Sequence, residues 1–352
     1  MRRFGLLLLN EFRMTRTALV VNLIAVLQPT LMYALMATIM VMPTFTMNVV
    51  RPAEDYGLIS AMEQVGSPIG MAYIEPILLE TAETGFRQVI EVEEGAGVPV
   101  AVQRYSYIDS NLVKNLRNRL TAALLVMWNR QLGSEAVTLH QHPWLPEDIS
   151  YNVYFGMAMI PLAAYLAAAM IGGYLMAQEF EHGTVLEYRL SPVSFLLLLA
   201  AKITRLLLTG LLAGAVLYTA LGLITGVWAS AILPVFLPIL PLALIAACIG
   251  LLAGLLTRSS LPAFLVALAS AFGFWLLGSG FGLAAGFSGI FERVSRAIPN
   301  TPVIEMLFPY FYFGRQVAAH PAAAKVQLVV YCVVLVALVI VAYRQRVLRM
   351  EK

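Results

Sequence analysis

The most polar part of the second half of the chain is one short stretch between two long apolar runs, Glu179 to Ser194 (EFEHGTVLEYRLSPVS). Three glutamates, a histidine and an arginine fall within eleven residues there. Carboxylates in such a setting can pair with basic groups or bind the free N–H groups at the start of a helix. A polar hinge between two apolar segments has to face water, so we expect this stretch to be a contact surface.

Motifs for catalysis and nucleotide binding are absent from the sequence. No Gly-x-x-x-x-Gly-Lys-Ser/Thr occurs, and none of the four lysines follows a glycine, so the chain lacks the loop of a P-loop ATPase. It also has no HExxH and no complete Gly-x-Ser-x-Gly. His140 and His142 form an HQH pair, but without a third ligand nearby we interpret them as ordinary surface. We therefore assign no catalytic residue, no metal ligand and no cofactor to this chain.

The composition indicates a polytopic membrane protein. Of 352 residues, 60% are hydrophobic and only 12% are charged, and the mean hydropathy is +0.80. Soluble domains carry about a quarter of charged residues. The net charge of +3 is too small to suggest a nucleic-acid partner. The two cysteines, Cys248 and Cys332, lie inside apolar runs, where cysteine usually acts as a small hydrophobic residue.

Six apolar runs are long enough to cross a bilayer, which needs about 20 residues in a helix. They are residues 18–42, 153–178, 195–225, 232–256, 261–285 and 326–343. The first run contains Asn22 and Gln28, which could line a substrate path, although helix packing is the simpler role for polar residues there. Pairs of small residues such as Gly250 and Gly254 predict close helix contacts.

Four regions lie outside the spans. Residues 1–17 suit an amphipathic helix at the membrane interface, or simply the charged flank of the first span. Residues 43–152 form a net-negative insertion with strands expected at 87–93 and 98–105 and a helix from Asp109 or Ser110 to about 132, a small α+β domain. Residues 286–325 are rich in aromatics and prolines and predict short interfacial or re-entrant helices. Residues 344–352 form a basic tail.

The distribution of positive charge predicts the orientation. Six spans put the first seventeen residues, the hinge region, the turn at Arg258 and the tail on one side, and these regions carry most of the arginines and lysines near the spans. Basic residues favour the cytoplasm. We therefore expect both termini in the cytoplasm and the domain at 43–152 outside. The predicted fold class is a mainly α polytopic membrane protein, with six transmembrane helices and a small α+β extracytoplasmic domain between the first and second.

The polar hinge resembles a signature of ABC exporter permeases of the second integral-membrane type. The pattern E-x-E-x-G-T followed by an acid and by Ser-Pro joins the second and third spans of such permeases. The family usually has its last acid two positions after the threonine, where this chain has Leu186 and then Glu187. The stretch FPYFYFGRQV from Phe308 to Val317 also resembles the family's Pro-aromatic-Arg segment. The resemblance extends over most of the chain, and matches the domain at 43–152 only loosely.

The resemblance implies a six-span subunit that pairs into a dimer, with an identical chain or a paralogue, and works with separate ABC ATPase subunits that hold ATP and Mg²⁺. It implies that the hinge at 179–194 is a coupling helix that docks into the ATPase. In that setting Thr184 and Glu187 would form a capping box at the start of the helix, and Pro192 would end it. The first two acids would pair with the ATPase or cap the helix. The coupling residues are then Glu179, Glu181, Gly183, Thr184, Glu187, Ser191 and Pro192.

The implied location is the bacterial inner membrane, as a multi-pass protein surrounded by lipid. The apolar spans suit a hydrophobic or amphipathic cargo such as a drug, an antibiotic or a lipid, and the outer domain could contact a periplasmic adaptor. The alternative is a membrane-anchored sensor or assembly protein whose outer domain does the work. An intramembrane enzyme is less favoured because the span cores lack titratable residues.

Overall fold

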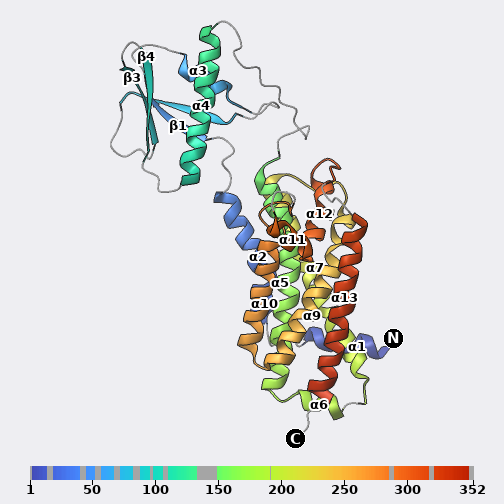
Figure 1. The fold of residues 1–352 in the computed structure, drawn as a ribbon. Coiled ribbons are helices and arrows are strands. Elements are labelled where there is room, and N and C mark those ends of the chain that lie inside the picture. The colour runs from blue at the N-terminus through green and yellow to red at the C-terminus, as the bar shows by residue number, and fades with distance from the viewer. Residues whose placement is uncertain are drawn as a thin grey trace. The chain divides into compact units, whose positions relative to one another are not determined.

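The computed structural model describes residues 2–13, 19–39, 45–51, 57–66, 72–81, 88–95, 98–105, 110–132, 149–190, 192–284, 289–316 and 321–348. The chain divides into two compact units, one made of Met1–Met40 with Tyr151–Lys352 and the other of Val41–Ser150. The first unit is a helical bundle and the second holds a small sheet (Figure 1). Among the described residues, six helical segments of the bundle are long and apolar enough to cross a membrane. The predicted fold class is therefore confirmed.

The bundle begins with a short surface helix, α1 (Arg2–Arg13), and contains six spans with three short helices between them. The spans are α2 (Leu19–Ile39), α5 (Tyr151–Glu181), α7 (Phe195–Thr225), the broken pair α8 (Ile232–Phe236) and α9 (Ile239–Thr257), α10 (Ser260–Leu277) and α13 (Pro321–Tyr343). The short helices are α6 (Val185–Leu190), α11 (Ile290–Ala297) and α12 (Asn300–Phe311), and a π-helical turn, Arg344–Leu348, follows α13.

Helix α5 is the centre of the bundle. It packs against α2, α7, α9, α10 and α12, and the most apolar 18 residues of its span are all buried. Small residues let the neighbours come close. A Cβ at Gly210 of α7 would lie 2.7 Å from the carbonyl oxygen of Ala164, and one at Gly254 of α9 would lie 2.7 Å from that of Gly173. The close contacts expected from the glycine spacing are therefore present along the α5 seams.

Three span boundaries differ from the sequence prediction. The second span continues through Glu181, because Glu179 has partners inside the protein. The fifth span ends at Leu277, eight residues before the apolar run does, because the backbone turns at Gly278, whose carbonyl oxygen accepts a hydrogen bond from Asn300 Nδ2 at 3.0 Å. The sixth starts at Pro321, a residue suited to a first helical turn. The described part of the segment at 286–325 contains two short helices, α11 and α12, and their interfacial or re-entrant placement stays a prediction.

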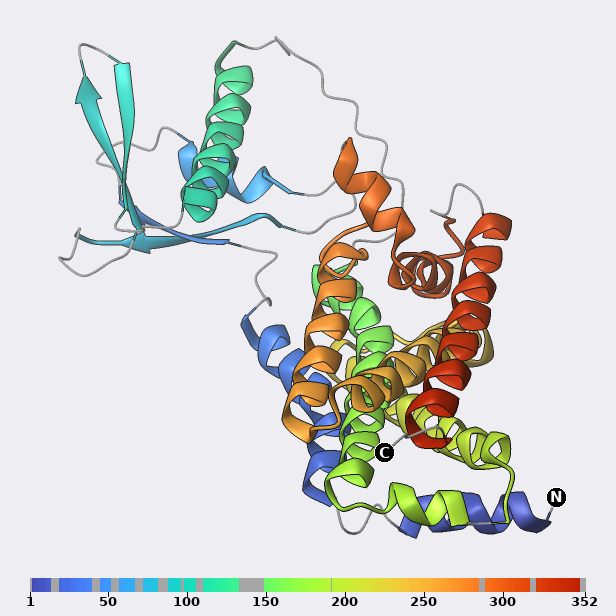
Figure 2. The same ribbon diagram turned by 60° about the horizontal axis from the view of Figure 1, so that its bottom comes forward.

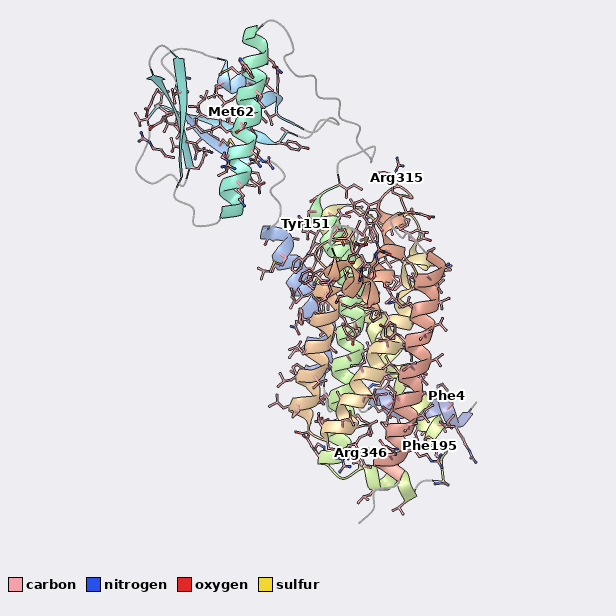
Figure 3. The ribbon with its side chains drawn as sticks, viewed as in Figure 1. Phe4, Met62, Tyr151, Phe195, Arg315 and Arg346 are labelled. Carbon is pink, nitrogen blue, oxygen red and sulfur yellow. The ribbon has the colours of Figure 1, made fainter. Side chains whose placement is uncertain are left out.

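The two ends of the bundle have different elements. One end, here called the α6 end, carries α1, α6, the turn at Arg258 and the π-helical turn, while α11 and α12 lie at the other, the α12 end (Figure 2). Phe4, Phe195 and Arg346 mark the α6 end, and Tyr151 and Arg315 mark the α12 end (Figure 3). The four basic regions of the sequence that the structure describes therefore lie at one end.

The second unit is an α+β fold. Its sheet has the order β2-β1-β3-β4, formed by β1 (Phe45–Val50), β2 (Ile74–Leu79), β3 (Gln88–Gly95) and β4 (Val98–Tyr105). Strand β1 pairs in parallel with β2 and β3, and β3 pairs with β4 as an antiparallel hairpin. Helices α3 (Leu58–Gln64) and α4 (Ser110–Leu132) share its core, which includes Met47, Met62, Ile90 and Leu120. The hairpin and α4 match the prediction, whereas β1, β2 and α3 were not predicted. Asp109 lies outside the described residues.

Candidate functional site

The polar stretch folds as the end of one helix, a tight turn and a second short helix. Helix α5 ends at Glu181, and the amide of Gly183 donates to the carbonyl oxygen of Phe180 at 3.2 Å. Gly183 has a φ of +72°, in the left-handed region that favours glycine. Helix α6 then begins at Val185, with the amide of Glu187 donating to the carbonyl oxygen of Thr184 at 3.0 Å. A bulkier residue at Gly183 would strain this turn, which sets the direction of α6.

Glu179 lies inside the protein and does not face water. It is 3% exposed, and its Oε1 accepts hydrogen bonds from the Tyr188 hydroxyl at 2.9 Å and from the Lys202 ammonium. The partners come from α6 and α7, so one carboxylate holds the end of α5, the short helix and the third span together. The expectation of a fully water-facing hinge is wrong for this residue. The two partners of Oε1 compensate for part of the lost hydration, while Oε2 has no hydrogen-bond partner.

Two further charges complete this cluster. Lys202 Nζ also lies 2.9 Å from Oε1 of Glu11 on α1, and Arg205 Nη1 lies 3.5 Å from Oε2 of the same glutamate. Glu11, Lys202 and Arg205 are all buried, although the two bases lie only one to two helical turns from the start of α7. The cluster of Glu11, Glu179, Tyr188, Lys202 and Arg205, here called the charge cluster, holds two acids and two bases. Its charges balance, as burial requires.

Tyr188 is the hydrogen-bonding link between α6 and the charge cluster. Its ring also lies 5.1 Å from the Lys202 ammonium, a cation–π distance. Burial raises the pKa of the Tyr188 hydroxyl above its ordinary value; the Lys202 charge opposes the shift and the Glu179 carboxylate adds to it. The hydroxyl therefore stays protonated and can donate to Glu179. Helix α6 is attached to the bundle through a neutral donor on a charged acceptor, one of the stronger kinds of hydrogen bond.

Glu181 caps a helix, but not the predicted one. Its carboxylate accepts from the amide of Ser260 at 2.7 Å and from the hydroxyl of the same residue. Ser260 is the first residue of α10, so the carboxylate satisfies a free N–H at a positive helix end. Beside this contact, the guanidinium of Arg258 lies 5.5 Å from the ring of Phe180. The end of α5 is thereby tied to the turn between α9 and α10.

The remaining predicted coupling residues lie at or near the surface. Thr184 Oγ1 donates to the carbonyl oxygen of Glu179 at 3.3 Å, and the Glu187 amide uses the Thr184 carbonyl, so neither makes the predicted capping box. Glu187 and Pro192 are exposed, and α6 ends at Leu190, two residues before the proline. Ser191 lies outside the described residues. The predicted residues therefore divide into an anchored part and an exposed part.

The exposed part of α6 includes two residues that the sequence reasoning missed. Leu186 is 57% exposed and Leu190 is 87% exposed, while Val185 on the same helix is buried. Together with Glu187 they give the short helix an apolar and acidic outer face. The sequence contained a signal for this apolar outer face. A helix as short as α6 does not need both Leu186 and Leu190 to pack against the bundle.

The other predicted residues form no comparable site. Asn22 is buried on α2 and Gln28 is half-buried, and α2 packs on α5 and α7. These contacts are compatible with the packing role, and the substrate path stays a prediction. Among the described residues, no group of three His, Cys, Asp or Glu side chains could hold a metal ion. His140 and His142 lie outside that part of the chain.

Comparison with known families matches this architecture. The family described as ABC-2 family transporter protein matches residues 70–342 of the chain, which is most of its length. The match covers α5 to α13 almost completely, including the hinge and the charge cluster except Glu11. No curated protein sequence matches the chain. The chain belongs to the ABC-2 transporter family, and it is the membrane-spanning component of such a transporter.

Proposed function

Starting from this family membership, we propose that the chain is the permease of an ATP-driven exporter and that α6 is the helix on which a separate ABC ATPase docks. The observation that carries the proposal is the two-sided character of α6. Leu186, Glu187 and Leu190 are exposed, whereas Tyr188 on the same helix is bonded into the charge cluster. A helix with one face in the bundle and one apolar face outside is suited to transmit a push from a partner.

The charge cluster would transmit a movement of α6 to the helices of the bundle. Displacing α6 moves Tyr188, which is bonded to Glu179 at the end of the central helix α5. Lys202 connects the same carboxylate to α7 and, through Glu11, to α1. Buried ion pairs have a narrow range of favourable geometries, so the connected helices are expected to move as a unit. ATP-driven motion of the docked ATPase would in this way reach three helices at once.

The orientation follows from the placement of the basic regions at the α6 end. By the positive-inside preference this supports an orientation with that end and both termini in the cytoplasm. The proposed membrane is the bacterial inner membrane. The unit at 41–150 would then lie outside, where it could meet a periplasmic adaptor. ATP and Mg²⁺ belong to the partner ATPase, and a second permease, identical or paralogous, completes the transporter. A hydrophobic or amphipathic cargo is compatible with the apolar surface of the spans.

The test is to co-express the chain with the ABC ATPases of its own genome and to measure co-purification and ATP-dependent export. The double variant Leu186→Ser with Leu190→Ser removes only exposed apolar surface, so the bundle should fold. We expect at least a tenfold loss of ATPase association, about 1.4 kcal/mol or more. Leu78→Ser, an exposed leucine on β2, is the matched control and should associate normally. Normal association of the double variant would rule out docking on α6.

A further inference from the structure

The α12 end contains a cavity that the proposed coupling does not use. It has a volume of about 560 Å³ and lies between α8, α9, α12 and α13. Small-molecule sites usually have volumes of about 300–1,000 Å³, with mostly apolar walls and a few polar groups. The walls here are formed by aliphatic side chains and by prolines, including Pro234, Pro238 and Pro309. The proline ring fixes the backbone angle φ. The backbone along this wall of the cavity therefore has less conformational freedom than a wall without prolines.

A buried carboxylate, Glu305, lines the cavity. It is 6% exposed, and its one ion pair among the described residues is with Arg296, whose Nη1 lies 3.8 Å away. That distance is too long for a hydrogen bond. Arg296 is engaged elsewhere, since its Nε donates to Glu292 at 2.9 Å. The Glu305 side chain has no hydrogen bond to the described residues, so its carboxylate is available to a donor on a ligand in the cavity.

A charge of opposite sign lines the same cavity. Lys325 in the first turns of α13 is exposed, so the ammonium lies at the mouth while the carboxylate lies deeper. The ion pairs of the described residues do not join these two groups to each other. Burial raises the pKa of the Glu305 carboxyl, with Arg296 opposing the shift. The cavity thus holds a negative and a positive group at different depths in an apolar wall.

The surface around the cavity is apolar. Leu233 and Leu237 at the α8 side are 76% and 62% exposed, and Val326 and Val329 at the α13 side are 63% and 60% exposed. These helices belong to the fourth and sixth candidate spans, and their exposed faces are apolar enough to contact hydrocarbon. A ligand in the cavity could keep its apolar part along these faces while its polar group reaches the charged residues.

We propose that this cavity binds a zwitterionic amphiphile, whose amine meets Glu305, whose acidic group meets Lys325 and whose apolar part lies against the proline wall. The proposal does not depend on docking of an ATPase at α6. It predicts tighter binding of a zwitterionic amphiphile than of a purely cationic or purely anionic one, because each of those contacts only one of the two charged side chains in the cavity. The recognised chemistry is an amine and a phosphate carried on an apolar chain.

The experiment measures binding of three single-chain amphiphiles to the purified, detergent-solubilised protein by native mass spectrometry. The probes are lysophosphatidylethanolamine, lysophosphatidylglycerol and an alkylamine of equal chain length. We expect the zwitterion to bind about tenfold more tightly than either other probe, since a charge-assisted hydrogen bond contributes about 1.4 kcal/mol or more. Soluble phosphoethanolamine, which has the headgroup alone, should compete only weakly.

Two single variants separate the two contacts. Glu305→Gln should weaken the zwitterion and the alkylamine about tenfold and spare the anionic lipid. Lys325→Gln should weaken the zwitterion and the anionic lipid and spare the alkylamine. The matched controls are Glu187→Gln on α6 and Arg293→Gln on α11, both exposed and outside the cavity, and they should leave all three affinities unchanged. Met306→Trp should fill the cavity and weaken all three.

Three results would overturn the proposal. The first is equal binding of all three probes to the unmodified protein. The second is an unchanged preference in both Glu305→Gln and Lys325→Gln. The third is competition by phosphoethanolamine as strong as that of the lysolipid, which would mean that a free amino-phosphate and not an amphiphile is recognised. Because Lys325 is exposed, its variant should fold normally, so the test does not depend on the stability of the Glu305 variant.

Discussion

Glu179 and Glu305 are both buried carboxylates, but the two ends of the bundle hold them in different ways. Glu179 at the α6 end has the Tyr188 hydroxyl at 2.9 Å and the Lys202 ammonium as partners. Glu305 at the α12 end has a guanidinium at 3.8 Å and lines a cavity. Burial alone therefore does not define the role of a charged side chain. Glu179 is fixed by two donors to its Oε1, although its Oε2 has no hydrogen-bond partner. The Glu305 side chain has no hydrogen bond to the described residues and lines a cavity, so it is suited to a ligand.

Removing the central base of the charge cluster should give the largest effect. Lys202→Met leaves Glu11 and Glu179 buried with one partner less each, and breaking a buried pair in this way is expected to lower stability by about 3–5 kcal/mol. Thermal unfolding in detergent, followed by fluorescence-detected size exclusion, measures the loss. Lys114→Met on the exposed face of α4 is the control. Stability equal to that of the unmodified protein would show that the α6 end is not held by its charges.

A substitution in the close packing contact between α5 and α9 should give the next largest loss of stability. A Cβ at Gly250 of α9 would overlap the carbonyl oxygen of Ala169 on α5, so Gly250→Ala has to push the helices apart. Overpacking of this kind lowers stability by about 1–3 kcal/mol. Gly273→Ala on α10 has no atom within 4 Å of the new Cβ and should be neutral or slightly stabilising. If both variants unfold at the same temperature, the close packing of α5 and α9 does not limit stability.

The smallest effect, with a distinct pH dependence, is expected at Glu305. Its pKa is raised by burial, so the folded protein binds this proton more tightly than the unfolded chain does. The stability that this proton adds therefore appears as the pH falls through the raised pKa, and it is complete below the unfolded value of about 4.3.

Glu305→Gln removes that dependence. At pH 7.5 the variant should be as stable as the unmodified protein or slightly more stable, by up to about 1 kcal/mol. The difference should shrink as the pH falls towards 5. Melting temperatures of both proteins at the two pH values check this, and each protein serves as the reference for the other. A variant that is strongly destabilised at pH 7.5 would place Glu305 with Glu179 as a structural charge.

The sequence was sufficient to predict what composition and periodicity control. The six spans, the gathering of basic regions at one end and the two short helices after the fifth span all follow from local patterns. The early end of α10 did not, because residues 278–285 remain mostly apolar. There the backbone turns at Gly278 and accepts a bond from Asn300, a contact between positions 22 residues apart.

The charge cluster was beyond prediction for a similar reason. Lys202 and Arg205 lie near the start of an apolar run, a position from which long basic side chains commonly extend to the membrane surface. The acid on α1, Glu11, lies 191 positions from Lys202 in the chain, and one sequence offers no way to pair them. In the smaller unit, β1 and β2 were missed because parallel neighbours lack the short turn that reveals a hairpin.

The burial of α5 limits how the protein can change shape. Between Ala163 and Ala169 the helix is mostly alanine, so the surface it offers to α7, α9 and α10 has low ridges. Side chains that do not interlock deeply resist sliding less than leucine ridges do. Rotation or sliding of α9 and α10 against α5 is therefore the change of arrangement that this packing opposes least, while α7 stays joined to α5 through the charge cluster.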